Sequence, residues 1–208
     1  MRLIWRSVGG LVVVLLIAWV AALNAPSEQS LGTGIRLVYI HVGLIWVGLL
    51  GITVAGLCGL VALAFASPWS ERWLGPLAWV GLGMFIAGFL FSMPAASVNW
   101  GAIFWAEPRY FAISLAICVG LLTQAAYGWL PWLRAKGAIQ AGYALYVTFS
   151  ILLTPLVLHP RNPAFQDGSG LIPYFFVGFF LLFLSYAVWL VWSISQWLQE
   201  DMGGVENG

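Results

Sequence analysis

Long apolar stretches separated by short polar segments make up most of this chain. Asp, Glu, Lys and Arg occur only in the separating segments. Each apolar stretch can cross a hydrocarbon core of about 30 Å at about 1.5 Å per helical residue. Backbone groups in lipid must be satisfied within their own segment, and the sequence has no barrel-like alternation, so we expect helices. The predicted spans cover residues 8–23, 37–65, 76–93, 110–130, 138–158 and 173–198.

The composition agrees with this pattern. Of 208 residues, 62% are hydrophobic and only 7% are charged, which no soluble domain could bury. We therefore predict an all-α, polytopic integral membrane protein with six transmembrane helices in one domain, residues 1–208. The net charge of +1 provides no basic face for nucleic acid. Cys58 and Cys118 lie in separate apolar stretches outside any CxxC pattern and are interpreted as core residues, not as a disulfide.

Basic residues favour one orientation of this domain. One side of the membrane would carry Arg2, Arg6, Arg72, Arg134 and Lys136, and the other Arg36, Arg109 and Arg161. The positive-inside rule then predicts that both termini are cytoplasmic in a bacterial inner membrane. We prefer an uncleaved first helix to a signal peptide over residues 1–25, because Leu23 stands where cleavage needs a small side chain.

Prolines and small residues suggest local features of the helices. Pro76 and Pro173 are predicted to lie in first helical turns, where a missing N–H costs nothing. Pro155 either kinks the fifth helix just before His159 or is an ordinary membrane-helix proline. Small residues along the second span predict close helix packing: Gly43, Gly48, Gly51, Ala55 and Gly59.

The predicted membrane interior contains no Asp, Glu, Lys or Arg. Ion-coupled carriers, proton pumps and voltage sensors usually keep such a group at mid-membrane, so these classes are disfavoured. No catalytic constellation is evident either, and we do not expect an enzyme. Any chemistry is expected at the non-cytoplasmic face.

The two histidines of the chain, His41 and His159, belong to different spans but map to that face. An aromatic segment, residues 94–109, lies between them in sequence and is predicted to form an outer loop. Imidazole is a good iron ligand, so the pair could clamp one haem from opposite sides. Trp100, Phe104 and Trp105 could cover the porphyrin. The candidates for pairing with propionates are Arg36, Arg109 and Arg161.

Two other interpretations of the histidines stay open. Each could be an interfacial hydrogen-bonding group, and most of the 13 tryptophans could be interfacial belt residues. A zinc site is disfavoured because two histidines are too few. Glu107 could be a third metal ligand only if its loop folds back.

Three segments carry a resemblance to a known family. They are Tyr39-Ile40-His41-Val42 followed by Trp46, Leu158-His159, and the segment from Trp100-Gly101 to Glu107-Pro108-Arg109. The last resembles the tryptophan-rich WWD signature, WGxWWxWDxR. Together with the hydropathy profile, these segments resemble the CcmC/CcsA family of haem-handling membrane proteins in cytochrome c assembly.

The signature is degenerate in this chain. Ile103, Phe104 and Ala106 stand where it has tryptophans, Trp105 falls at a variable position, and Glu107 replaces the aspartate. The aromatic platform is therefore thinner than in the family pattern.

The resemblance implies a haem-binding protein of c-type cytochrome biogenesis, which holds non-covalent b-type haem at the outer face for delivery to an acceptor. His41 and His159 would be the axial ligands of the haem iron. The other haem-binding residues would be Trp100, Gly101, Trp105, Glu107 and Arg109. The implied partners are a periplasmic haem chaperone or the apocytochrome c assembly machinery. The chain has no nucleotide-binding motif, so any ATP-driven step would need an ABC-type ATPase partner.

Two alternatives belong to other classes. The same histidines could hold a permanent b-type haem in an electron-transfer subunit. The chain could also be a haem-free structural subunit that tolerates loss of both histidines.

Overall fold

The computed structural model describes residues 2–155 and 170–205, and the regular elements of those residues are all α-helices. The helices are α1 (Arg2–Leu23), α2 (Ile35–Phe65), α3 (Pro68–Trp100), α4 (Pro108–Trp129), α5 (Leu133–Leu153) and α7 (Ile172–Val205). The predicted all-α class is therefore confirmed for the described residues.

Four helices are long and apolar enough to cross a membrane: α2, α3, α4 and the Ile172–Glu200 part of α7. This supports a membrane protein. The apolar part of α1, Ser7–Leu23, is shorter. Helix α5 carries Arg134 and Lys136 close to its start. Six spans therefore stay a prediction.

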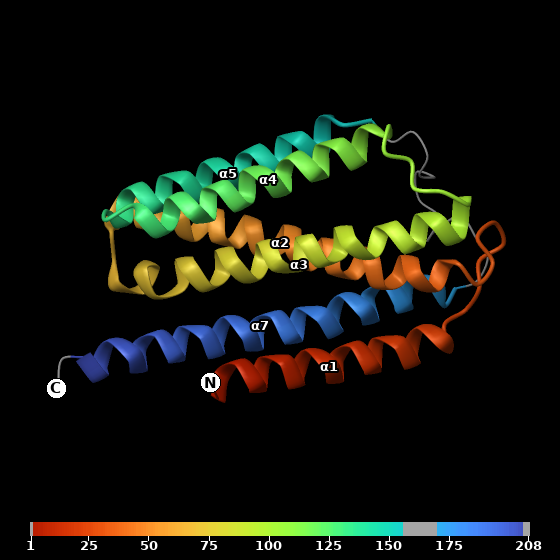
Figure 1. Ribbon diagram of the computed structural model, residues 1–208, viewed down its shortest axis with the longest axis horizontal. Coiled ribbons are helices and arrows are strands. Elements are labelled where there is room, and N and C mark those ends of the chain that lie inside the picture. The colour runs from red at the N-terminus through yellow and green to blue at the C-terminus, as the bar shows by residue number, and fades with distance from the viewer. Residues whose placement is uncertain (1, 156–169, 206–208) are drawn as a thin grey trace.

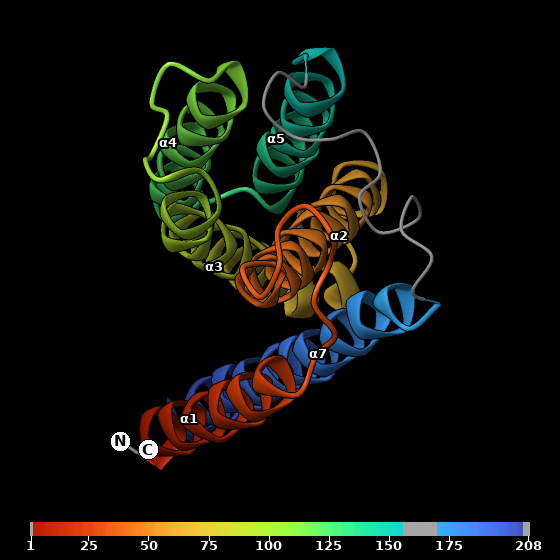
Figure 2. The same cartoon turned by 90° about the vertical axis from the view of Figure 1, so that its right-hand side faces the viewer.

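The helices run along one another in three pairs (Figure 1). Seen end-on, α2 and α3 lie between the α4/α5 pair and the α1/α7 pair (Figure 2). The α1–α2 and α3–α4 connections lie together at one end, which we call the His41 end. The α2–α3 and α4–α5 connections lie at the other, the Arg72 end, and both termini are directed toward it (Figure 1).

Helix α2 is the centre of this arrangement, and its small residues explain why. A Cβ added at Gly51 would lie 2.6 Å from the Cα of Gly81 on α3. One added at Gly59 would lie 2.6 Å from the Gly137 carbonyl oxygen on α5, and one at Gly43 would lie 3.2 Å from the Phe179 Cβ on α7. The prediction of close packing along α2 is thus confirmed, and its glycines face three different helices.

An aromatic cluster fixes the start of α2 against α7. The fully buried Tyr39 ring lies 4.8 Å from Phe176 and 5.8 Å from both Phe175 and Phe179, measured between ring centroids. Such edge and offset contacts stabilise a pair by about 0.5–1.5 kcal/mol beyond area burial. They hold the turn of α2 that precedes His41.

Two proline predictions were wrong. Helix α3 begins at Pro68, not at Pro76, because the Ser67 hydroxyl caps it by accepting from the Ser70 N–H at 3.2 Å. Pro76 and Pro94 both lie inside α3. Pro155 follows α5 and does not kink it: Thr154 is already extended, with φ −83° and ψ 123°, as residues before proline prefer. Pro173 does lie in the first turn of α7, as predicted.

The α2/α3 contact provides a matched test. The change Gly81→Ala should lower the unfolding free energy by about 1–3 kcal/mol, because the added methyl has no space against the α2 backbone. Two residues along the same helix, a Cβ at Gly83 would meet nothing within 4 Å. Gly83→Ala should therefore leave stability unchanged or raise it slightly. Thermal unfolding of the two variants in detergent would compare them, and equal losses would contradict the packing argument.

Candidate functional site

His41 lies in the second turn of α2 and is held by α3. Its Nδ1 is 2.9 Å from the Gly88 carbonyl oxygen, so Nδ1–H donates and the lone pair of this tautomer is on Nε2. The absence of a side chain at Gly88 permits this approach, since a Cβ there would lie 2.7 Å from the Ile45 nitrogen. A histidine whose ring is oriented through Nδ1 by a carbonyl has the geometry found in metal-binding imidazoles.

A cavity of about 160 Å³ adjoins this ring. It is lined by residues of α2, α3 and α4: His41, Val42, Ile45, Trp46, Phe89, Ser92, Arg109, Tyr110 and Ile113. Two residues singled out from the sequence, His41 and Arg109, are therefore brought to one cavity although 68 positions separate them (109 − 41).

Arg109 contributes an unsatisfied donor beside the cavity. Within the described part of the chain, its buried Nε has no hydrogen-bond partner, and neither does that of Arg36. A buried guanidinium N–H costs free energy until an acceptor reaches it. A carboxylate-bearing ligand in the cavity would pair with the Arg109 guanidinium.

The aromatic segment is less loop-like than predicted. Residues 94–109 were expected to form an outer loop, but α3 continues through Pro94 to Trp100 and α4 starts at Pro108. The connection is therefore only residues 101–107. Gly101 ends α3 with φ +77° and donates its N–H to the Ser97 carbonyl at 2.9 Å. This left-handed cap is a position that favours glycine.

The tryptophans of this segment have different surroundings. Trp100 packs, partly buried, on the cluster formed by Phe89, Ala96 and Tyr110. Trp105 is 62% exposed and meets the Tyr110 ring edge-on at 6.1 Å. Both indoles therefore contact the helical wall that carries the cavity, and Trp105 also presents a free face.

Glu107 is buried, with 4% of its surface exposed, at the N-cap of α4. The positive end of the helix dipole favours a carboxylate there. Glu107 does not line the His41 cavity, and the described residues contain no group of three His, Cys, Asp or Glu able to hold a metal. The conditional interpretation of Glu107 as a third metal ligand has no support in this arrangement.

His159 and Arg161 lie outside the described residues. The structure therefore does not bring His159 to His41 or separate the two. Helix α5, which precedes His159 in sequence, ends at Leu153 at the His41 end (Figure 1).

Sequence reasoning missed three residues that build this site. Gly88 holds the His41 ring, and Ser92 and Tyr110 join α3 to α4: the Tyr110 hydroxyl donates to the Ser92 carbonyl at 3.1 Å. The spacing of four between Gly88 and Ser92 places both on one face of a helix, a signal that the sequence did contain. Nothing in the sequence indicated that this face would meet His41.

No protein-family model matches the chain, and no curated protein matches it with significant similarity.

The left-handed cap at Gly101 yields a prediction for the aromatic segment. A Cβ there would meet nothing within 4 Å, so the change Gly101→Ala should act only through the backbone and cost about 1–2 kcal/mol. Gly101→Asn should cost less, because asparagine tolerates this conformation. Gly128 has equal space around it and no positive φ, so Gly128→Ala is the control. Thermal unfolding would rank the variants, and a harmless Gly101→Ala would contradict the assigned cap.

Proposed function

We propose that this chain is a membrane haem-binding protein of c-type cytochrome biogenesis, which holds haem at the His41 end for delivery to an acceptor. The observation that carries the proposal is the oriented His41 imidazole in a cavity that Arg109 also lines. The resemblance of the histidine and tryptophan segments to the CcmC/CcsA family supports it further.

The residue types at this site are those that bind the parts of a haem. Bound haem would supply an iron for imidazole ligation, a planar macrocycle for aromatic contact and two carboxylates. His41 would serve as an axial ligand through Nε2, and His159 would be the second. Arg109 would pair with a propionate. Trp100, Gly101, Trp105 and Glu107 would shape the segment that borders the haem.

The cavity is smaller than sites that enclose a ligand. Sites that enclose a drug-sized ligand measure about 300–1,000 Å³, whereas this cavity has about 160 Å³. A porphyrin would therefore enter only in part and stay accessible from outside. Trp105, which contacts the cavity-lining Tyr110, is 62% exposed, and Phe104, its neighbour in sequence, is 40% exposed. An acceptor such as a periplasmic haem chaperone would dock on this aromatic edge, and any ATPase would act as a separate subunit.

Absorption spectra test the haem proposal. The detergent-purified protein supplied with haem should give a low-spin bis-histidine spectrum, oxidised and dithionite-reduced. His41→Ala and His159→Ala should each weaken it or turn it high-spin. Added imidazole should restore the low-spin spectrum of His41→Ala, a result that a merely structural histidine would not give. Thr123→Val, on α4 away from the cavity, is the control.

Two outcomes would contradict this proposal. One is a wild type that stays empty after haem in excess, which would leave a haem-free membrane subunit. The other is an unchanged spectrum in both histidine variants. Haem that resists extraction by apomyoglobin while cycling reversibly would instead favour an electron-transfer subunit.

We also propose that the chain spans a bacterial inner membrane six times with both termini in the cytoplasm. The distribution of basic residues in the sequence supports this orientation, because the Arg72 end carries Arg72, Arg134 and Lys136.

Cysteine labelling tests the orientation. In a Cys58→Ala, Cys118→Ala background, Thr33→Cys and Ala102→Cys at the His41 end should react with a membrane-impermeant maleimide added to intact spheroplasts. Pro131→Cys at the Arg72 end should react only after the membrane is opened. All three positions are exposed, so accessibility to the reagent depends on sidedness. The reverse pattern would show the opposite orientation.

A further inference from the structure

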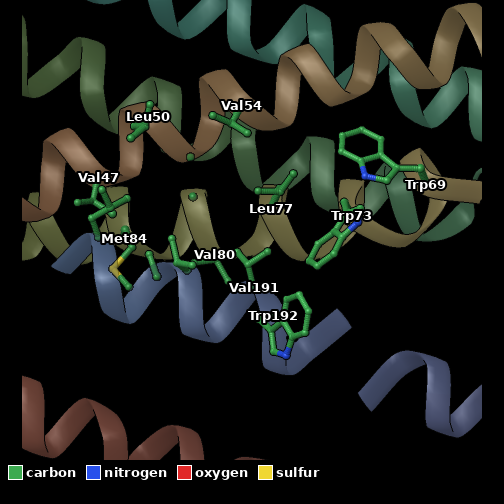
Figure 3. A pocket seen from close by; sticks show the side chains of 15 residues that line it. Val47, Leu50, Val54, Trp69, Trp73, Leu77, Val80, Met84, Val191 and Trp192 are labelled. Carbon is green, nitrogen blue, oxygen red and sulfur yellow. The ribbon is translucent and has the colours of Figure 1, made fainter. Parts of the chain in front are cut away.

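A second cavity lies between α2, α3 and α7, mostly in the half of the helix bundle nearer the Arg72 end. It has a volume of about 400 Å³, and its walls are almost entirely hydrocarbon and indole (Figure 3). It starts among Trp69, Trp73 and Trp192 and runs toward Val47 and Met84 (Figure 3). We call it the tryptophan groove. It is separate from the His41 cavity, with which it shares no lining residue.

This groove is long enough to hold an acyl chain that spans one leaflet. Lining residues of α3 extend from position 69 to position 84, and 15 helical positions at about 1.5 Å each cover about 22 Å. Half of a hydrocarbon core is about 15 Å deep. The groove also opens toward lipid, since Leu50, Val188 and Trp192 on its walls are among the exposed large hydrophobic residues.

The Arg72 guanidinium lies at the end of the groove that is lined by tryptophans. The Arg72 guanidinium lies 4.8 Å from the Trp73 ring centroid and 5.9 Å from that of Trp192, and both rings line the groove. Its Nε donates to the buried Ser195 hydroxyl at 2.8 Å, and the Gln199 side-chain oxygen can accept from the same group. The side chain is thus held in place between α3 and α7.

Arg72 has no carboxylate partner within salt-bridge distance among the described residues. Its contacts there are with indole rings, a hydroxyl and an amide. A guanidinium that is half-buried at the membrane interface is stabilised by an anion, and phosphate matches its fork of donors. Tryptophans such as Trp69, Trp73 and Trp192 concentrate at the headgroup level of a bilayer, so this end of the groove is expected at that depth.

We propose that the tryptophan groove binds an anionic phospholipid of the leaflet at the Arg72 end, with one acyl chain in the groove and the phosphate on Arg72. Lipid tails are as apolar as the groove walls, so burying the chain gives little preference among lipids. Selectivity comes from the charge at Arg72, and one basic side chain near the surface is worth about a fivefold preference for anionic lipid. This inference does not depend on haem binding.

The experiment compares two lipids that differ only in headgroup charge. Dioleoyl phosphatidylglycerol should raise the Tm of the delipidated full chain more than dioleoyl phosphatidylcholine does, because it binds the folded state more tightly. Native mass spectrometry should show about fivefold more bound phosphatidylglycerol. Arg72→Gln should abolish this preference. Arg134→Gln should retain it, because Arg134 is exposed at the same end but does not contact the groove.

A second variant separates groove binding from a folding defect at Arg72. Val188→Trp would fill the groove while leaving Arg72 in place, and it should lose the phosphatidylglycerol effect at unchanged Tm without lipid. Inorganic phosphate should not raise the Tm of the wild type, and a rise would indicate a simple anion site. Equal effects of the two lipids, or an Arg134→Gln variant as impaired as Arg72→Gln, would overturn the proposal.

Discussion

The direct contact of the α2 backbone with its neighbours is the constraint on which the rest of the structure depends. Within lipid, apolar side chains gain nothing from leaving their surroundings, so helices associate through close van der Waals packing. Gly51 and Gly81 let α2 and α3 approach until a single methyl would collide, and Gly59 and Gly137 do the same for α2 and α5. The packing distance is set by backbone atoms and has little freedom to vary.

Both sites follow from that approach. Near one end of the α2/α3 contact, Gly88 brings its carbonyl to the His41 ring and fixes the tautomer. Near the middle of the contact, Gly51 and Gly81 line the tryptophan groove without side chains, which leaves space for a hollow between α2, α3 and α7. These glycines look like simple packing residues in the sequence. They nevertheless determine how the His41 ring is oriented and where the tryptophan groove has space for a ligand.

The sequence was sufficient for the features that depend on local composition. Long uncharged stretches predicted the helical class, and small residues predicted that α2 packs closely. Helix ends were harder, because a proline is tolerated inside a membrane helix as well as at its start, and Ser67 outweighed Pro76 as the start signal of α3. The site could not be predicted, since the Gly88 carbonyl reaches the His41 ring, and Tyr110 lines the same cavity as His41, only through the register of three helices.

The two proposed sites are independent, which follows from where the charges are placed. The predicted spans contain no Asp, Glu, Lys or Arg through which a change at one end could alter the charge at the other. Gly88 and Arg72 stand 16 positions apart on α3, or about 24 Å at about 1.5 Å per residue. Substitutions separated by more than about 7–10 Å without shared partners act additively. A variant at Arg72 should therefore leave the proposed haem ligation at His41 intact, and any coupling between them would have to pass through the shared α2/α3 backbone contact.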